Sequence, residues 1–143
     1  MGQISTSVQL EHAPEKVFSL ATDPQRYEEW MTIHTKWKGD VPTEFTKGAQ
    51  VSEVVTMLGM PNTITWTVDE LDGHKVSMSG TGMAGVQVRI TIEVEPHEVG
   101  SSMNLSTEFS GSMIVGALGK AVEKDGQKQL EASLEKFQGL LVG

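Results

Sequence analysis

The chain contains no cysteine, which excludes disulfide bonds, thiolate metal sites and cysteine nucleophiles. Basic residues are scarce: 11 Lys and Arg stand against 19 Asp and Glu, and the formal net charge is −8 at pH 7. Because nucleic acids and anionic membrane surfaces bind clustered Lys and Arg, neither is expected as a partner. No stretch reaches the ~20 apolar residues of a membrane-spanning helix, so membrane insertion is not expected. The first residues lack the basic and apolar segments of a signal peptide, and we therefore predict a cytoplasmic protein.

What the chain does contain is typical of a globular protein. Hydrophobic residues make up 38% and charged residues 21% of its 143 residues, which excludes the disordered and fibrous classes. A chain of this length is expected to form one domain, and no internal repeat or low-complexity segment divides it. We therefore predict a single domain over residues 1–143.

The first part of the chain predicts one strand and two short helices. Apolar and polar residues alternate over residues 3–10, as in a half-buried strand. A helix is predicted to begin at Pro14, and a second short helical turn, DPQRYEEW, follows it. In that turn Asp23 can cap the first backbone N–H groups, and Tyr27 and Trp30 fall on one face. A turn this short is stable only when that face packs against the rest of the protein.

The remaining sequence changes from a period of two to a helical period. Six stretches alternate or are rich in β-branched residues, and turns containing Gly, Pro or Asn separate them: residues 31–38, 49–58, 62–71, 75–82, 86–95 and 101–112. Strands so close in sequence, with no helix between them, pair as an antiparallel meander. After residue 112 the pattern predicts a long helix. Its apolar stripe consists of Leu118, Val122, Gly126, Leu130, Leu134, Phe137 and Leu141.

These elements predict an α+β fold. A sheet with one apolar face and a helix with one apolar stripe bury these surfaces against each other. The arrangement expected is a seven-stranded curved antiparallel sheet around a long C-terminal helix. Two short helices after the first strand would close one end.

Two pairs of segments resemble those of a known family. APEKVFSLATDPQRYEEW and, after the sheet, EASLEKFQGLL resemble the START-like, or SRPBCC (Bet v 1-like), superfamily of helix-grip proteins. RYEEWMTIHTKWKGDVP, followed by KGAQVSEVVTMLGMPNTITWTV, is most similar to an actinobacterial subgroup within the polyketide cyclase/dehydrase and lipid-transport group. The resemblance covers nearly the whole chain.

This resemblance implies the helix-grip fold and a deep cavity between the sheet and the long helix, which holds an apolar or amphipathic ligand. Members of the superfamily include carriers, aromatase/cyclases and plant allergens, so the fold alone leaves the chemistry open. Some members of the actinobacterial subgroup are described as the toxin half of a toxin–antitoxin pair. That description comes with no catalytic motif that can be placed on these residues.

Strand alternation and the helical stripe select the residues expected to line such a cavity. They are Tyr27, Trp30, Trp37, Val55, Met57, Trp66, Met78, Val88, Ile90, Met103, Leu105, Phe109, Leu118, Val122 and Gly126. Several of the eight methionines fall on the inner face, and methionine adapts to ligands of varied shape. Gly126 removes side-chain volume from the stripe, although a helical glycine also permits close packing. The residues alone allow a pocket or a solid core, and the resemblance favours the pocket.

GTGMAG, from Gly80 to Gly85, matches the dinucleotide-binding pattern G-x-G-x-x-G. Such a site needs a helix after the loop, because the helix N-terminus holds the pyrophosphate. Here VQVRITIEVE follows, and it alternates as a strand does. We therefore predict a glycine-rich hairpin that binds no nucleotide.

Glu53 and His34 are the candidate catalytic residues. Glu53 alternates with Val51 and Val55 and so faces inward, unless a one-residue bulge turns it outward, and both alternatives stay open. An inward carboxylate could act as an acid or base or could hold a ligand hydroxyl. His34 alternates with Lys36 and is predicted to point outward, at most to the rim of the cavity. No two of the four histidines have metal-ligand spacing, so no metal site is predicted.

The sequence thus predicts a protein that binds or transports a hydrophobic or amphipathic small molecule, such as a lipid or polyketide-like compound, without a cofactor. One alternative is a polyketide cyclase/dehydratase-type enzyme that uses Glu53 or His34. Another is a toxin-like interaction protein with a protein partner, for which an exposed apolar patch beside Trp30 and Trp37 is expected. The sequence specifies neither the ligand nor the oligomeric state.

Overall fold

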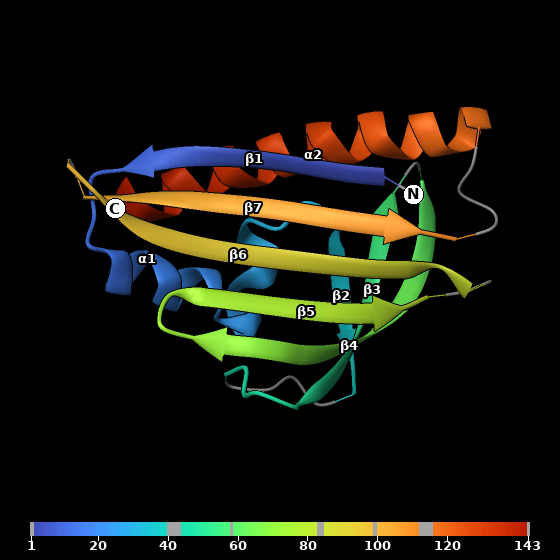
Figure 1. The fold of residues 1–143 in the computed structure, drawn as a ribbon, viewed down its shortest axis with the longest axis horizontal. Coiled ribbons are helices and arrows are strands. Elements are labelled where there is room, and N and C mark those ends of the chain that lie inside the picture. Colours follow the sequence, from blue (N-terminus) through green and yellow to red (C-terminus); the bar gives the residue numbers. More distant parts are fainter. Residues whose placement is uncertain are drawn as a thin grey trace.

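The computed structural model describes residues 2–39, 44–57, 59–82, 85–98, 100–111 and 116–142. In this part of the chain one strand is followed by two short helices, six strands and a long helix (Figure 1). The elements are β1 (Gly2–Leu10), α1 (Pro14–Ala21), η1 (Pro24–Glu29), β2 (His34–Lys38), β3 (Gln50–Met57), β4 (Met60–Asp72), β5 (Lys75–Thr81), β6 (Gln87–His97), β7 (Gly100–Ser110) and α2 (Gly116–Val142).

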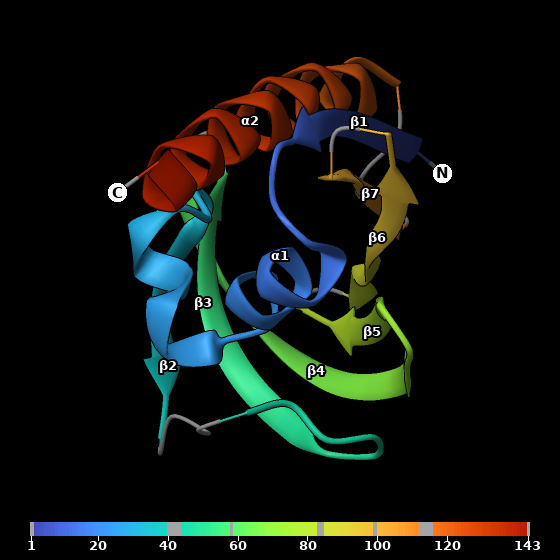
Figure 2. The same ribbon diagram turned by 90° about the vertical axis from the view of Figure 1, so that its left-hand side faces the viewer.

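The strands form one antiparallel sheet in the order β1-β7-β6-β5-β4-β3-β2. Strands β2 to β7 follow one another as neighbours, and β1 joins the far side of β7, with Leu10 opposite Ser101. The sheet curls strongly; α2 lies across its open side, and α1 and η1 lie at one end (Figure 2). The predicted α+β architecture of a curved seven-stranded sheet around a long C-terminal helix is confirmed.

The DPQRYEEW segment forms the short 3₁₀ helix η1. Asp23 caps it by accepting a hydrogen bond from the Gln25 N–H at 3.0 Å, and Pro24 takes the first helical position. Tyr27 and Trp30 are only 2% and 1% exposed, and their ring centroids lie 5.6 Å apart. The shared face of the turn therefore packs into the interior.

Helix α2 buries its predicted apolar stripe from Gly126 onwards but not in its first turn. The stripe residues Leu130, Leu134, Phe137 and Leu141 are buried, whereas Leu118 is 40% exposed. The ring centroids of Phe137 and Trp30 lie 5.0 Å apart, so the C-terminal half of α2 packs directly on the residues that follow η1. None of the helices in the described ranges is both long and apolar enough to cross a membrane.

Gly126 allows α2 to approach β1 closely. A Cβ atom at this position would lie 2.5 Å from Ile4 Cδ1 and 3.3 Å from Met57 Cε. Any larger residue would therefore displace the Ile4 side chain or move the helix away from β1. Close packing is one role of Gly126.

The glycine-rich segment GTGMAG connects β5 to β6. The strand β6 begins at Gln87, so among the described residues a strand follows the segment, and not a helix that could hold a pyrophosphate. The Gly82 N–H donates to the Val86 carbonyl oxygen at 2.8 Å, and Gly85 adopts a φ of 76°, which favours glycine. Residues 83 and 84 lie outside the described ranges, and the described part of the segment is the predicted hairpin.

Candidate functional site

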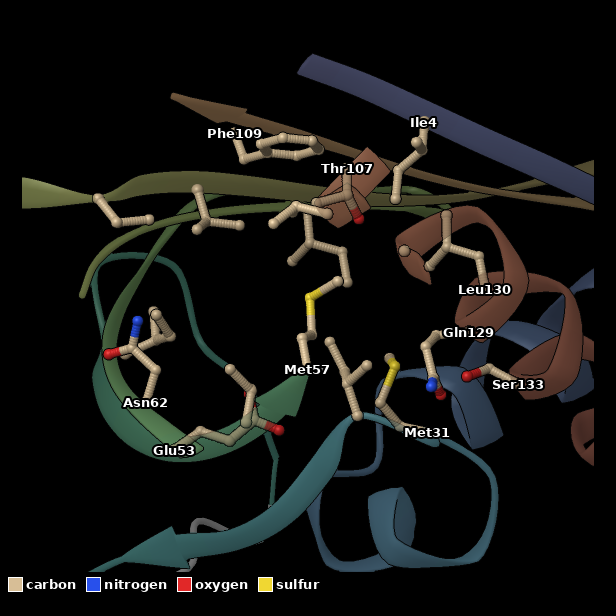
Figure 3. A pocket seen from close by; sticks show the side chains of 18 of the residues that line it. Ile4, Met31, Glu53, Met57, Asn62, Thr107, Phe109, Gln129, Leu130 and Ser133 are labelled. Carbon is tan, nitrogen blue, oxygen red and sulfur yellow. The ribbon is translucent and has the colours of Figure 1, made fainter. Parts of the chain in front are cut away.

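A cavity of about 290 Å³ lies between the concave face of the sheet and the N-terminal half of α2 (Figure 3). Its apolar lining consists of Ile4, Met31, Ile33, Val55, Met57, Met60, Pro61, Ile64, Met78, Val86, Val88, Ile90, Phe109, Leu118, Val122, Gly126 and Leu130. The lining side chains with polar atoms are Tyr27, Glu53, Asn62, Trp66, Thr107, Gln129 and Ser133. On β3, β4, β6 and β7, inward positions two residues apart therefore build an almost continuous apolar wall.

The cavity opens to solvent at one end. Met60 is 57% exposed and Leu118 is 40% exposed, and they are the exposed large hydrophobic residues among those described. Both line the cavity, Met60 at the start of β4 and Leu118 in the first turn of α2. We call this opening the mouth. Tyr27 and Glu53, which also line the cavity, are 2% and 4% exposed and form its buried end.

Most residues that the sequence selected as cavity-lining lie in this wall. They are Tyr27, Val55, Met57, Trp66, Met78, Val88, Ile90, Phe109, Leu118, Val122 and Gly126. The selection of Trp30, Trp37, Met103 and Leu105 is corrected by the structure, because these four side chains lie outside the lining.

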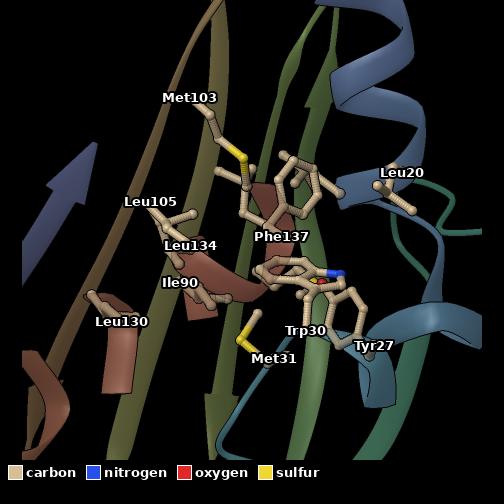
Figure 4. Packing of buried hydrophobic residues seen from close by; sticks show 14 of the residues in the cluster. Leu20, Tyr27, Trp30, Met31, Ile90, Met103, Leu105, Leu130, Leu134 and Phe137 are labelled. Atoms are coloured by element: carbon tan, nitrogen blue, oxygen red, sulfur yellow. The ribbon is translucent and has the colours of Figure 1, made fainter. Parts of the chain in front are cut away.

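Trp30, Met103 and Leu105 belong to the solid core instead. Met103 and Leu105 have no exposed surface, and Figure 4 shows them with Trp30 around Leu134 and Phe137. All three lie in the interior, as the sequence pattern indicated. However, the C-terminal half of α2 already fills the interior beside them.

Trp37 packs behind the cavity wall. Its Nε1 donates to the Pro24 carbonyl oxygen at 2.7 Å, which ties β2 to the start of η1. Its ring centroid lies 5.4 Å from that of Tyr27. Trp37 therefore supports Tyr27 and does not itself reach the cavity.

The sequence interpretation missed the polar residues that α2 contributes to the wall. Gln129 and Ser133 lie one turn apart on α2 and line the cavity. The Thr32 N–H donates to Ser133 Oγ at 3.0 Å, and Thr32 Oγ1 donates to the Gln129 carbonyl oxygen at 3.0 Å. The sequence signal that could have identified Gln129 and Ser133 is their i, i+4 spacing, which places both on one helix face beside Leu130 and Leu134. These bonds fasten the segment before β2 to α2.

Glu53 faces inward, so the alternative of an outward-turning bulge is excluded. Its Oε1 accepts a hydrogen bond from Trp66 Nε1 at 2.8 Å, and its Oε2 lies 2.5 Å from His34 Nδ1. An ionised carboxylate only accepts hydrogen bonds, so His34 Nδ1 carries the proton in this state. Gly80 leaves room for this arrangement, because a Cβ atom there would lie 2.9 Å from Trp66 Cε3.

The prediction that His34 points outward is wrong. The His34 side chain is 4% exposed and lies between the strands, bonded to Glu53. The pairing of β2 with β3 shifts register between His34 and Lys36, so the simple alternation that placed these two side chains on one face does not hold. His34 contacts the rings of Tyr27 and Trp37, with centroid distances of 5.9 Å and 5.0 Å. It lies behind Glu53, outside the cavity lining.

Tyr27 lines the buried end of the cavity and carries an unpaired hydroxyl group. Its ring is enclosed by the rings of Trp30, His34 and Trp37, and its hydroxyl has no hydrogen-bond partner among the described residues. Burial raises the pKa of the Tyr27 phenol above its ordinary value of about 10, and the nearby Glu53 carboxylate raises this pKa further. The phenol is therefore neutral and able to donate a hydrogen bond.

Among the described residues that line the cavity, one is acidic and none is basic. All 11 Lys and Arg residues of the chain fall within the described ranges, and none of them lines the cavity. Glu53 is the one formally charged residue among the described lining residues. Nor do three His, Asp or Glu side chains come together anywhere in the described ranges as a metal ion requires. The site can enclose a carbon skeleton and form a few hydrogen bonds at its buried end.

Comparisons with known proteins agree with this geometry. A model of the family described as polyketide cyclase/dehydrase and lipid transport matches residues 1–141. The chain is similar to toxin Rv0910 of Mycobacterium tuberculosis, with 31% identity over 144 residues and 100% of both chains covered. It is similar in structure to a START superfamily protein from Mycobacterium smegmatis, with a TM-score of 0.77, 14% identity, and 96% and 94% of the two chains covered.

A second structural likeness is to Ara h 8.0201. The TM-score is 0.70 at 12% identity, with 99% of this chain and 97% of that chain covered. At such low identity these likenesses show the fold alone. The START-like, Bet v 1-like helix-grip fold that the sequence resemblance implied is thereby confirmed.

The burial of Tyr27 is testable because it is the only tyrosine of the chain. We expect no tyrosinate absorbance near pH 10, where an exposed phenol ionises, and its appearance only when the protein unfolds. The unfolded state loses this proton at about pH 10 while the native state keeps it, so the free energy of unfolding falls as the pH rises above about 10. An alkaline titration followed by ultraviolet absorbance and circular dichroism measures both. In Tyr27→Phe, the part of the fall in the free energy of unfolding that comes from this phenol is expected to be absent. If the wild-type phenol instead ionises near pH 10 while the circular dichroism spectrum is still that of the folded protein, the buried position of Tyr27 is wrong.

The His34–Glu53 contact is testable by a double-mutant cycle. His34→Phe is expected to lower the free energy of unfolding by about 3–5 kcal/mol, because it leaves the buried Glu53 carboxylate without one of its two donors. The double variant His34→Phe/Glu53→Gln is expected to lose less, since an amide carries no charge and its oxygen still accepts from Trp66. Urea denaturation of the four proteins gives the coupling energy. The exposed neighbour Lys36→Ala serves as the control, with a change within about 0.5 kcal/mol. If the changes in the free energy of unfolding of the two single variants simply add up in the double variant, the contact contributes no coupling energy and the prediction is wrong.

Proposed function

We propose that this chain, which belongs to the polyketide cyclase/dehydrase and lipid transport family, binds a hydrophobic or amphipathic small molecule between its sheet and α2. The observation that carries the proposal is the cavity of about 290 Å³, whose wall is apolar except near a few hydrogen-bonding side chains. Apolar walls with a few polar groups are typical of small-molecule sites. The exposed residues Met60 and Leu118 mark the entrance.

The physical properties of the wall indicate how the ligand binds. Transfer of apolar surface from water contributes about 25 cal/mol per Å² buried, so the carbon body of the ligand supplies most of the binding free energy. The cavity volume stands at the lower edge of the roughly 300–1,000 Å³ of ligand pockets, which favours a compact molecule over a lipid with two acyl chains. The lining includes Met31, Met57, Met60 and Met78. Their unbranched side chains can adjust to ligands of somewhat different shape.

One observation favours a second candidate, an acid–base enzyme of the cyclase/dehydratase type. The Glu53 carboxylate lies in the cavity wall, where it could take a proton from a carbon next to a ligand carbonyl. His34 would then be a positioning residue, because it contacts Glu53 and not the cavity. Conversion of a bound ligand that stops in Glu53→Gln, with binding retained, would establish this function. Because both Glu53 oxygens already accept hydrogen bonds, the structure favours binding as the first candidate.

The toxin name of a relative suggests a third function, which no particular contact supports. An interaction surface was expected beside Trp30 and Trp37. Trp30 is 1% exposed, and Trp37 is partly buried with its indole nitrogen bonded to Pro24. In the described part of the chain, the large exposed hydrophobic residues lie at the mouth of the cavity instead.

The binding function is testable by filling the cavity. Val122 lines it on α2, and Val122→Trp is expected to weaken binding of a neutral fluorescent hydrophobe such as N-phenyl-1-naphthylamine at least tenfold. Glu123→Trp places the same side chain on the exposed face of α2, and its affinity is expected to equal that of the wild type. Fluorescence titration measures both, and mass spectrometry of an organic extract of the purified protein identifies any molecule that it retains. An equal loss of affinity in the two variants, or no binding of the compound by the wild type, would contradict the proposal.

A further inference from the structure

We propose that the buried end of the cavity recognises one uncharged oxygen atom of the ligand, a carbonyl or a hydroxyl, through the hydroxyl group of Tyr27 beside Glu53. This inference rests on the proposed function and names its ligand class. Neutral hydrophobic ketones, esters and alcohols fit the site, whereas fatty acids and other anions do not.

The unpaired Tyr27 hydroxyl is the first observation behind this inference. Two buried side-chain polar atoms have no hydrogen-bond partner among the described residues, Tyr27 Oη and Trp30 Nε1. Of these two residues only Tyr27 lines the cavity. Its hydroxyl oxygen has less than 1 Å² of accessible surface in the empty protein, so a ligand oxygen meets it only when the side chains around it shift. A buried hydroxyl without a partner is unfavourable in the empty protein. An oxygen atom on the ligand would remove that penalty by accepting the Tyr27 proton.

The second observation is the sign of the charge at this end. The Glu53 carboxylate lines the same buried end, and it disfavours a second negative charge beside it. A carboxylate or phosphate would need Lys or Arg to offset this repulsion, and none of the 11 in the chain lines the cavity. The oxygen that Tyr27 meets is therefore an uncharged one. A ligand hydroxyl can in addition donate to Glu53, whose two oxygens retain acceptor capacity.

The shape of the cavity places this oxygen at one end of the ligand. Glu53 lies on β3 four residues from Met57, which pairs with the mouth residue Met60. At about 3.3 Å per residue, the buried end is about 13 Å from the mouth. Figure 3 shows the Glu53 side of the cavity facing Thr107 and Phe109 on β7, with apolar side chains between them. The ligand thus has one oxygen at its buried end and an apolar body that extends towards the mouth.

A set of ligands with one carbon skeleton tests this specificity. We would measure displacement of N-phenyl-1-naphthylamine from the full chain by 2-decanone, 1-decanol, decanoate, decylamine and decane at pH 7. The ketone and the alcohol are expected to bind at least tenfold more tightly than decanoate. Tighter binding of decanoate or of decylamine than of the alcohol would overturn the inference.

A single-atom variant tests the role of Tyr27. Tyr27→Phe is expected to weaken binding of the ketone and the alcohol about five- to tenfold, to leave the affinity for decane unchanged, and not to destabilise the empty protein. Thr35→Val removes a hydroxyl from the exposed face of β2 and is the matched control, with unchanged affinities. Unchanged affinity of Tyr27→Phe for the oxygenated ligands contradicts the inference.

The two proposals fail in different ways. If the compounds bind to the wild type without preference for a neutral oxygen, the ligand class is wrong and the binding function stands. If neither the fluorescent compound nor any of the five ligands binds, the proposed function itself is wrong. Should Tyr27→Phe fail to fold, the order of the ligands on the wild type still decides the inference.

Discussion

The structure of the site depends on one buried carboxylate and the two donors that hold it. Glu53 faces an apolar cavity, a position that is unfavourable for a charge without hydrogen bonds. Both neighbouring strands supply a donor: His34 comes from β2 and Trp66 from β4. The irregular register of β2 brings His34 to the acid, and Gly80 on β5 leaves room for the Trp66 ring. Residues of four strands, β2 to β5, therefore hold the Glu53 side chain, donate hydrogen bonds to it or leave room for its donors.

A second constraint is that α2 fills only part of the interior. Towards its C-terminus, Leu134 and Phe137 complete a solid core, and Phe137 contacts Trp30. Towards its N-terminus, Val122 and Leu118 lie over the cavity and its mouth. Gly126 lies between these parts and brings the helix close to β1. The same helix thus provides stability at one end and leaves space for a ligand at the other.

Periodic patterns predicted the fold, because they report which way each side chain points. The alternation of the strands and the stripe of α2 predicted the sheet, its curvature around the helix and most residues of the cavity wall. The family resemblance favoured a cavity over a solid core. The patterns did not separate Met103 and Leu105 from the cavity, because core and cavity residues face the same way and differ only in what packs opposite them. The direction of His34 depended on a change of register that no local pattern records. The unpaired hydroxyl of Tyr27 is likewise visible only once its surroundings are known.

The balance between binding and catalysis at this site follows from how firmly Glu53 is held. Each oxygen of the carboxylate accepts a hydrogen bond from a ring that is itself buried, so the group is fixed in place. A fixed acceptor selects and orients a ligand well, because little conformational entropy is lost when the ligand binds. Proton transfer would in addition require a reacting carbon within hydrogen-bond reach of one of these oxygens. Tyr27 lines the cavity and its hydroxyl is unpaired, and a ligand oxygen bound to it, as proposed, would fix how far the rest of the ligand lies from Glu53. Under the proposed function, the position of that oxygen along the ligand would therefore determine whether the cavity only carries its ligand or also transforms it.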